Sequence, residues 1–84
     1  MFGMTAYEKT LARMRNNPRD WRIEDLKSMA KRLGIEVRHD GGSHHVFSLA
    51  GAAADVCVPA HRPIKPIYIR HFLSLCDAAL ERPV

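Results

Sequence analysis

The 84-residue sequence lacks the features that mark several large classes of protein. No apolar run approaches the roughly 18 to 20 residues of a membrane-spanning helix, and the first residues have no signal-peptide character. It contains only two cysteines, too few for the disulfide framework of a small secreted domain. From these absences we expect a cytoplasmic protein.

Metal and nucleotide motifs are also missing. The sequence has no Cys-x-x-Cys, His-x-His or carboxylate cluster, so we expect no metal site and no cofactor. Gly41-Gly42 is not followed by the Gly-Lys-Ser or Gly-Lys-Thr of a nucleotide phosphate loop. Cys57 and Cys76 each have apolar neighbours, which predicts two buried free thiols. Cys57 between two valines is better explained by packing than by nucleophilic chemistry.

The composition is that of one globular domain with an excess of positive charge. Hydrophobic residues make up 46% and charged residues 26%, and the net charge is +4. Counting side chains, residues 1–33 carry eight basic and four acidic groups, residues 34–58 one and three, and residues 59–84 four and two. The ends are therefore basic and the middle is acidic. This distribution suits a polyanionic partner, although ordinary lysine- and arginine-rich helix surfaces explain it equally well.

Two helices are expected in the first 34 residues. Thr5 and Glu8 form a capping box that starts a helix, and Pro18 ends it. Asp20 is the expected N-cap of a second helix, which Gly34 closes. Residues 1–17 are thus predicted to be a helical extension that precedes the main domain, residues 18–84.

From Ile35 the apolar period changes from 3.6 to 2, which predicts strands. The turn-forming residues 40–43 separate a first strand from a second at 44–49, a third follows at 55–58, and Pro66 opens a final helix. The predicted fold class is α+β, with a three-stranded antiparallel sheet and the helices packed on one of its faces.

Three of the five histidines, His44, His45 and His61, lie in or beside the predicted strands and the loop that follows them. An imidazole with a pKa of about 6.5 can accept and donate a proton near neutral pH. RNA carries its own nucleophile, so a base that removes the 2′-OH proton starts phosphodiester cleavage without a metal. These histidines are therefore candidates for acid-base chemistry on RNA.

Side-chain alternation separates the two neighbouring histidines. If Phe47 faces the helices, His45 points inward and His44 points to the open face, directly after the turn glycines that let a sugar-phosphate backbone approach. The alternative for His44 is an ordinary exposed strand residue. For His45 it is a partly buried, hydrogen-bonded histidine.

Four basic side chains lie nearest to the predicted strands and to the loop before the last helix: Arg38, Arg62, Lys65 and Arg70. Each is a candidate for binding phosphate, and each is equally consistent with a solvated rim. Lys65 directly precedes the helix opened by Pro66, whose free amides and dipole favour an anion there.

Gly42-Ser43-His44-His45 is followed, after Val46, by the aromatic Phe47, and Val58-Pro59-Ala60-His61 precedes Ile64-Lys65 and the last helix. These two motifs resemble those of the HicA toxins, also called YcfA-like proteins. The similarity covers about residues 20–80. It implies a double-stranded-RNA-binding-like α-β-β-β-α fold, mRNA interferase activity and a HicB-like antitoxin as partner.

The resemblance also implies roles for individual residues. The family's catalytic histidine falls on His44, with Gly42 and Ser43 as its motif neighbours, and His45 is a second candidate. His61 matches a common family histidine that would assist the leaving oxygen. The segment before residue 18 and the alanine-rich loop at 50–54 depart from the family pattern.

Two other functions remain open from the sequence. One is a non-catalytic RNA-binding module with the same fold. The other is an interaction domain that self-associates through Tyr7, Leu11 and Met14 of the N-terminal helix.

Overall fold

A computed structural model describes residues 6–52, 54–60 and 63–81. Along the chain the elements are α1 (Ala6–Asn16), α2 (Ile23–Leu33), β1 (Glu36–His39), β2 (His44–Ser48), β3 (Val56–Pro59) and α3 (Pro66–Glu81). The strands form one antiparallel sheet in the order β1-β2-β3. The predicted α+β fold, with helices on the sheet, is confirmed.

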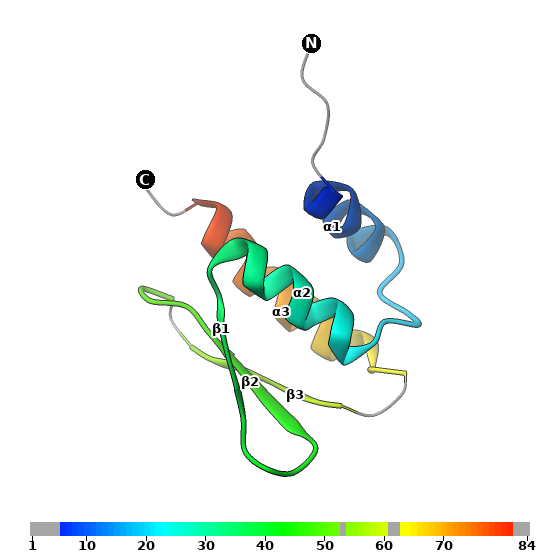
Figure 1. Cartoon of the computed structure of the whole chain (residues 1–84). Coiled ribbons are helices and arrows are strands. Elements are labelled where there is room, and N and C mark those ends of the chain that lie inside the picture. Colours follow the sequence, from blue (N-terminus) through cyan, green and yellow to red (C-terminus); the bar gives the residue numbers. More distant parts are fainter. Residues whose placement is uncertain (1–5, 53, 61–62, 82–84) are drawn as a thin grey trace.

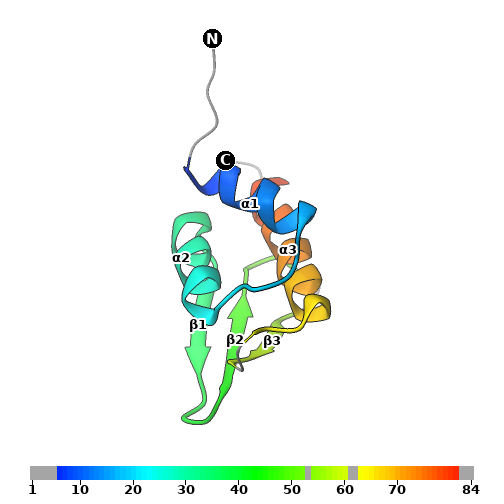
Figure 2. The ribbon, with the colours of Figure 1, turned by 90° about the vertical axis from the view of Figure 1, so that its right-hand side faces the viewer.

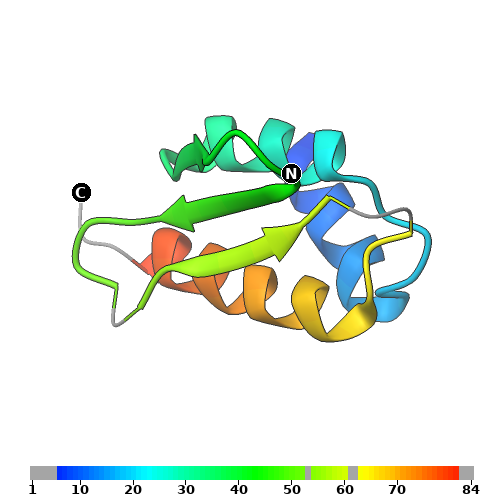
Figure 3. The ribbon, with the colours of Figure 1, turned by 90° about the horizontal axis from the view of Figure 1, so that it is seen from below.

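The elements form layers (Figure 1). Helices α2 and α3 lie side by side on one face of the sheet, with α2 against β1 and α3 against β3. Helix α1 packs on α3 on the side away from the sheet (Figure 2). Seen from below, the strands lie in front of the helices, so none of the described helices covers the outer face of the sheet (Figure 3). Within the described residues, no helix is long and apolar enough to cross a membrane.

The core lies between the sheet and the helices. Phe47 of β2 and Phe72 of α3 are fully buried and meet edge to face, with ring centroids 5.2 Å apart and an interplanar angle of 67°. Aromatic pairs prefer this geometry because the positive edge of one ring meets the negative face of the other. The contact joins the central strand to the longest helix.

Helix α1 belongs to the same core. Leu11 and Met14 are 3% and 0% exposed, and Tyr7 packs against the core cluster. An ion pair between Arg15 and Asp77 also links α1 to α3. The hypothesis of self-association through Tyr7, Leu11 and Met14 does not fit this arrangement, because Leu11 and Met14 are buried in the chain's own core and Tyr7 is partly buried against it.

The start of α2 differs from the prediction. The N-cap is Arg22, whose backbone amide donates to the Asp25 carboxylate at 3.0 Å, while Asp20 takes a left-handed φ of 64° two residues earlier. The adjoining Trp21 is buried, and its indole N–H donates to the Asn17 carbonyl at 2.7 Å. The buried indole thus lies in the turn that precedes α2. At the other end Gly34 has a φ of 75°, as expected for a C-cap glycine.

Both cysteines are free, as predicted, but only Cys76 is buried. Burial raises the pKa of the Cys76 thiol to about 12, because the thiolate would lose its hydration. The predicted burial of Cys57 is wrong. Cys57 lies opposite Val46 in the sheet register and shares its outward face, whereas Val58 points to the core.

Replacing Met14 with alanine tests whether α1 is part of the core. We expect Met14→Ala to lower the free energy of unfolding by about 2 to 5 kcal/mol, because it leaves a cavity at a fully buried position. Urea denaturation measures the change, and Lys9→Ala on the exposed side of α1 is the control. A loss below about 0.5 kcal/mol would contradict the packing of α1 on α3.

Candidate active site

Two hydrogen bonds fix Gly42 in the hairpin turn before β2. The Gly42 amide donates to the Asp40 carboxylate at 3.0 Å, and the Gly42 carbonyl accepts a hydrogen bond from the His39 imidazole. The bond from the Gly42 amide lowers the pKa of the exposed Asp40 carboxyl, because it stabilises the charged form. Gly41 has a φ of +87°, a conformation that favours glycine. These contacts fix where β2 begins and hence where His44 lies.

The two neighbouring histidines point to opposite faces, as the alternation predicted. His44 is exposed and pairs with Pro59, whereas His45 is only 7% exposed and pairs with Val58 on the core side. The predicted orientation of both side chains is therefore confirmed. His44 is the one that a substrate can reach.

His44 opens onto a pocket of about 320 Å³ at the end of the sheet. Its lining comes from β2, β3, the loop before α3 and the first turn of α3: His44, Pro59, Pro63, Ile64, Lys65 and Tyr68. Two backbone hydrogen bonds fix these segments, one between residues adjoining the two strands and one between the loop before α3 and the segment that joins α1 to α2. The Ala60 amide donates to the Ser43 carbonyl at 2.6 Å, and the Ile64 amide donates to the Trp21 carbonyl at 3.2 Å.

Lys65 directly precedes Pro66, the first residue of α3. Its carbonyl accepts the amides of Tyr68 and Ile69 at 3.0 and 3.4 Å, so it is the residue from which the helix starts. The side chain is exposed and lines the pocket with His44. The ammonium group and the positive end of the helix dipole therefore act on the same pocket wall, and both favour a bound anion.

The other predicted phosphate-binding residues lie elsewhere. Arg38 forms an exposed ion pair with Asp55 at 3.4 Å, and neither residue lines the His44 pocket. Arg70 is exposed on α3 but does not line this pocket either. His61 and Arg62 lie outside the described residues. Among the described candidates, Lys65 alone shares the pocket with His44.

Tyr68 is a site residue that the sequence analysis missed. It is half-buried and lines the pocket beside Lys65 and His44. A signal was present, because Tyr68 follows Lys65 by three residues and residues three apart lie on the same side of a helix. Its aromatic face and hydroxyl add a stacking surface and a hydrogen-bonding group to the pocket.

His45 has a different environment. Its ring stacks on His39 with centroids 4.3 Å apart, and no described group completes a hydrogen bond to its buried Nδ1. Burial, together with the nearby His39 and Lys27, lowers the pKa of His45, while the Ser43 carbonyl and Asp40 oppose this effect only partly. The neutral ring is thus favoured, and His45 supports the hairpin from the core side.

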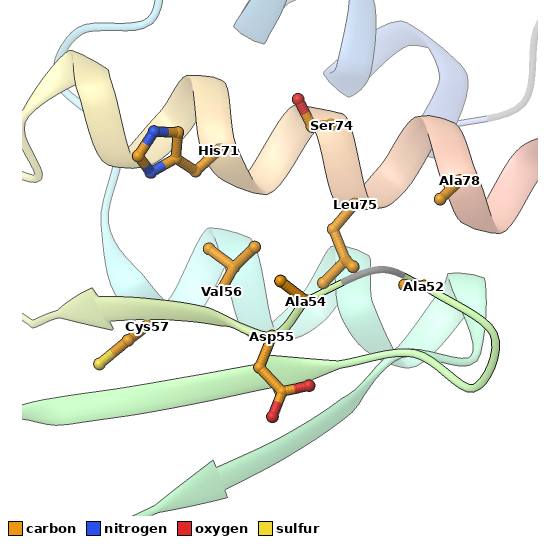
Figure 4. A pocket seen from close by; sticks show the side chains of 9 residues that line it. All are labelled: Ala52, Ala54, Asp55, Val56, Cys57, His71, Ser74, Leu75 and Ala78. Carbon is orange, nitrogen blue, oxygen red and sulfur yellow. The ribbon is translucent and has the colours of Figure 1, made fainter.

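A second pocket, of about 460 Å³, lies between β3 and α3 (Figure 4). Val56 and Leu75 face each other in it, and His71 and Ser74 line its α3 side. The Cys57 thiol points away from α3, so Cys57 and His71 do not form a nucleophile and base pair.

No group of three or more His, Cys, Asp or Glu side chains gathers as a metal site in the described part of the chain. No family model, no curated protein and no solved structure matches this sequence. The resemblance to HicA toxins therefore stays a prediction, and the function is inferred from the site.

The low pKa of His45 predicts a stability that depends on pH. Its pKa lies lower in the folded chain than in the unfolded chain, where it is about 6.5, so the unfolded state binds the proton first as the pH falls. We expect this contribution to stability to be complete above about pH 7 and to be lost progressively as the pH falls from about 6.5 through the folded pKa.

Thermal unfolding between about pH 5 and 8 measures this effect, with His45→Phe as the variant that cannot titrate. The variant should lose less stability on acidification than the wild-type chain. His71→Phe, at an exposed histidine on α3, is the matched control and should retain the wild-type pH dependence. Equal slopes for wild type and His45→Phe would contradict the assignment.

Proposed function

We propose that the protein is a metal-independent endoribonuclease of the toxin kind that cleaves mRNA. The observation that carries the proposal is that His44 and Lys65 line one exposed pocket. Cleavage by the 2′-OH uses a group that accepts the hydroxyl proton and a cation that stabilises the charge on the phosphoryl oxygens. The resemblance of residues 20–80 to HicA toxins supports the same function.

In the proposed reaction His44 accepts the proton of a ribose 2′-OH. The 2′ oxygen then forms a bond to the adjacent phosphorus, and the bond from phosphorus to the 5′ oxygen breaks with its electron pair, leaving a 2′,3′-cyclic phosphate. The departing 5′ oxygen takes up a proton, for which His61 or the Tyr68 hydroxyl is the donor. Lys65 stabilises the negative charge on the phosphoryl oxygens. No external nucleophile is required.

The nucleophile determines the class of substrate. Because the attacking oxygen is the 2′-OH, RNA is a substrate and DNA is not. A non-catalytic RNA-binding module is the alternative, and it is distinguished by binding without cleavage.

We further propose a cytoplasmic setting and a HicB-like antitoxin as the partner. His44 stands at the end of the outward sheet face, so an antitoxin seated on that face would block access to it. Co-expression with the protein encoded beside this gene should relieve any growth arrest that the chain causes alone.

Substitution of His44 is the direct test of the chemistry. We expect His44→Ala to lower the rate of RNA cleavage by about 10² to 10⁴-fold, because a positioned general base contributes that much. Cleavage of a labelled oligoribonucleotide under single-turnover conditions measures the rate. Products ending in a 2′,3′-cyclic phosphate would identify the 2′-OH as the nucleophile.

The matched control is His71→Ala, an exposed histidine outside the His44 pocket. It should cleave at the wild-type rate. If His44→Ala keeps full activity while it remains folded, the proposed chemistry is wrong. RNA binding by a wild-type chain that does not cleave would favour the binding module instead.

Two substitutions at Tyr68 separate stacking from proton transfer. If the ring alone positions a nucleobase, Tyr68→Phe should cleave at nearly the wild-type rate, whereas Tyr68→Ala should raise KM by about 5 to 160-fold through loss of about 1 to 3 kcal/mol of stacking. If the hydroxyl protonates the leaving oxygen, Tyr68→Phe should lower kcat instead. Wild-type kcat and KM in both variants would exclude Tyr68 from the site.

A further inference from the structure

We propose that a single RNA strand bound at His44 continues across Pro63 into a groove between the end of α1 and the start of α2, where Arg19 and Arg22 bind its phosphates. The inference rests on the proposed function and extends it. It assigns a role in substrate binding to the segment that joins α1 to α2, and the N-terminal extension contributes Arg13, Asn16 and Asn17 to the wall of the groove.

The groove is continuous with the candidate active site. Pro63 lines both the His44 pocket and a neighbouring hollow of about 260 Å³, which also has Asp20, Trp21 and Arg22 in its wall. Asp20 and Trp21 in turn line a third hollow, of about 470 Å³. The remaining residues of that third hollow come from α1, from the segment that joins α1 to α2 and from α2: Arg13, Asn16, Asn17, Arg19 and Asp25. We call these two hollows the basic groove.

The floor of the basic groove is preformed. Trp21 is only 9% exposed, and hydrogen bonds tie it to both neighbouring segments: its indole donates to the Asn17 carbonyl, and its carbonyl accepts the Ile64 amide. The Asn17 amide continues α1 by donating to the Arg13 carbonyl at 2.8 Å. One buried side chain thus fixes the groove relative to the loop that forms the His44 pocket.

Arg19 and Arg22, two of the three arginines of the groove, are available to bind phosphate, whereas Arg13 lies over the Trp21 ring. In the described part of the chain, ion pairs engage Arg15 and Arg38 but not Arg19 or Arg22, and both of these side chains are exposed. Two carboxylates, Asp20 and Asp25, also line the groove. The Asp25 carboxylate accepts the Arg22 amide at 3.0 Å, so the start of α2 already offsets part of its charge.

The chemistry of the groove favours the RNA backbone over the bases. Its one aromatic ring, Trp21, is buried, and the Arg13 guanidinium lies 5.5 Å from the ring centroid, so Trp21 offers little face to a base. Guanidinium groups bind phosphate by charge-assisted hydrogen bonds that carry no sequence information. We expect the groove to add affinity without adding sequence preference.

Binding of RNA by an inactive chain tests the proposal. In a His44→Ala background, a fluorescent single-stranded RNA of about 12 nucleotides should bind about tenfold more weakly to an Arg19→Gln, Arg22→Gln variant. The slope of log affinity against log salt should fall by about 1.4, since two phosphate contacts are lost at about 0.7 each for a single strand. In the chain that retains His44, a dinucleotide that fills only the His44 pocket should be cleaved equally well with and without the groove substitutions.

The charge-matched control is Lys9→Gln, Lys31→Gln, because both lysines are exposed and line neither the groove nor the His44 pocket. It should bind the long RNA nearly as the parent does. Equal losses in the two double variants would mean that only net charge matters and would overturn the groove, as would the absence of loss in both. Cleavage by the wild type together with unchanged binding in the groove variant overturns the groove alone, whereas groove-dependent binding without cleavage overturns only the proposed reaction.

Discussion

Phe47 packs edge to face on Phe72, and the rest of the candidate site depends on that contact. Because side chains alternate along a strand, a shift of β2 by one residue would turn Phe47 to solvent and His44 to the core. Burial of a phenylalanine is worth about 1.5 to 3 kcal/mol, so such a shift is strongly disfavoured. A hydrophobic contact in the core thus determines which of two adjacent histidines is exposed on the outward face of the sheet.

The pocket is built by backbone hydrogen bonds between segments that are distant in sequence. Ser43 accepts the Ala60 amide, which joins the residue before β2 to the residue after β3. Trp21 accepts the Ile64 amide, which joins the loop before α3 to the segment between α1 and α2. Loops usually tolerate movement because few contacts hold them. Here both ends of the loop between β3 and α3 are held, so Lys65 is positioned by the fold rather than by the loop alone.

Local patterns predicted most of the fold. The alternation in β2, the turn before it and Pro66 at the start of α3 were each evident from a few neighbouring residues, and the structure has them all. The errors concern features set by distant contacts. The N-cap is Arg22 rather than Asp20, which stands beside the buried Trp21, and Cys57 is exposed because its strand faces outward at that position. Apolar neighbours in sequence do not determine which face a residue takes.

In the candidate site, too, the features set by distant contacts could not be predicted from neighbouring residues. The orientation of His44 followed from the alternation of side chains along β2. The pairing of Arg38 with Asp55 and the position of Tyr68 in the pocket depend on contacts between segments that are distant in sequence. Composition indicated only that the middle of the chain is acidic and that its ends are basic.

The structure shows where the basic ends of the chain lie relative to His44. His44 lies at the end of the sheet rather than at its centre, beside Lys65 from the basic C-terminal part and next to the groove of Arg19 and Arg22 from the basic N-terminal part. On the outward face, the one arginine of the strands is already paired with Asp55. Lys65, Arg19 and Arg22 therefore lie at the end of the sheet where the proposed RNA would meet His44, whereas the arginine on the outward face of the strands is already paired.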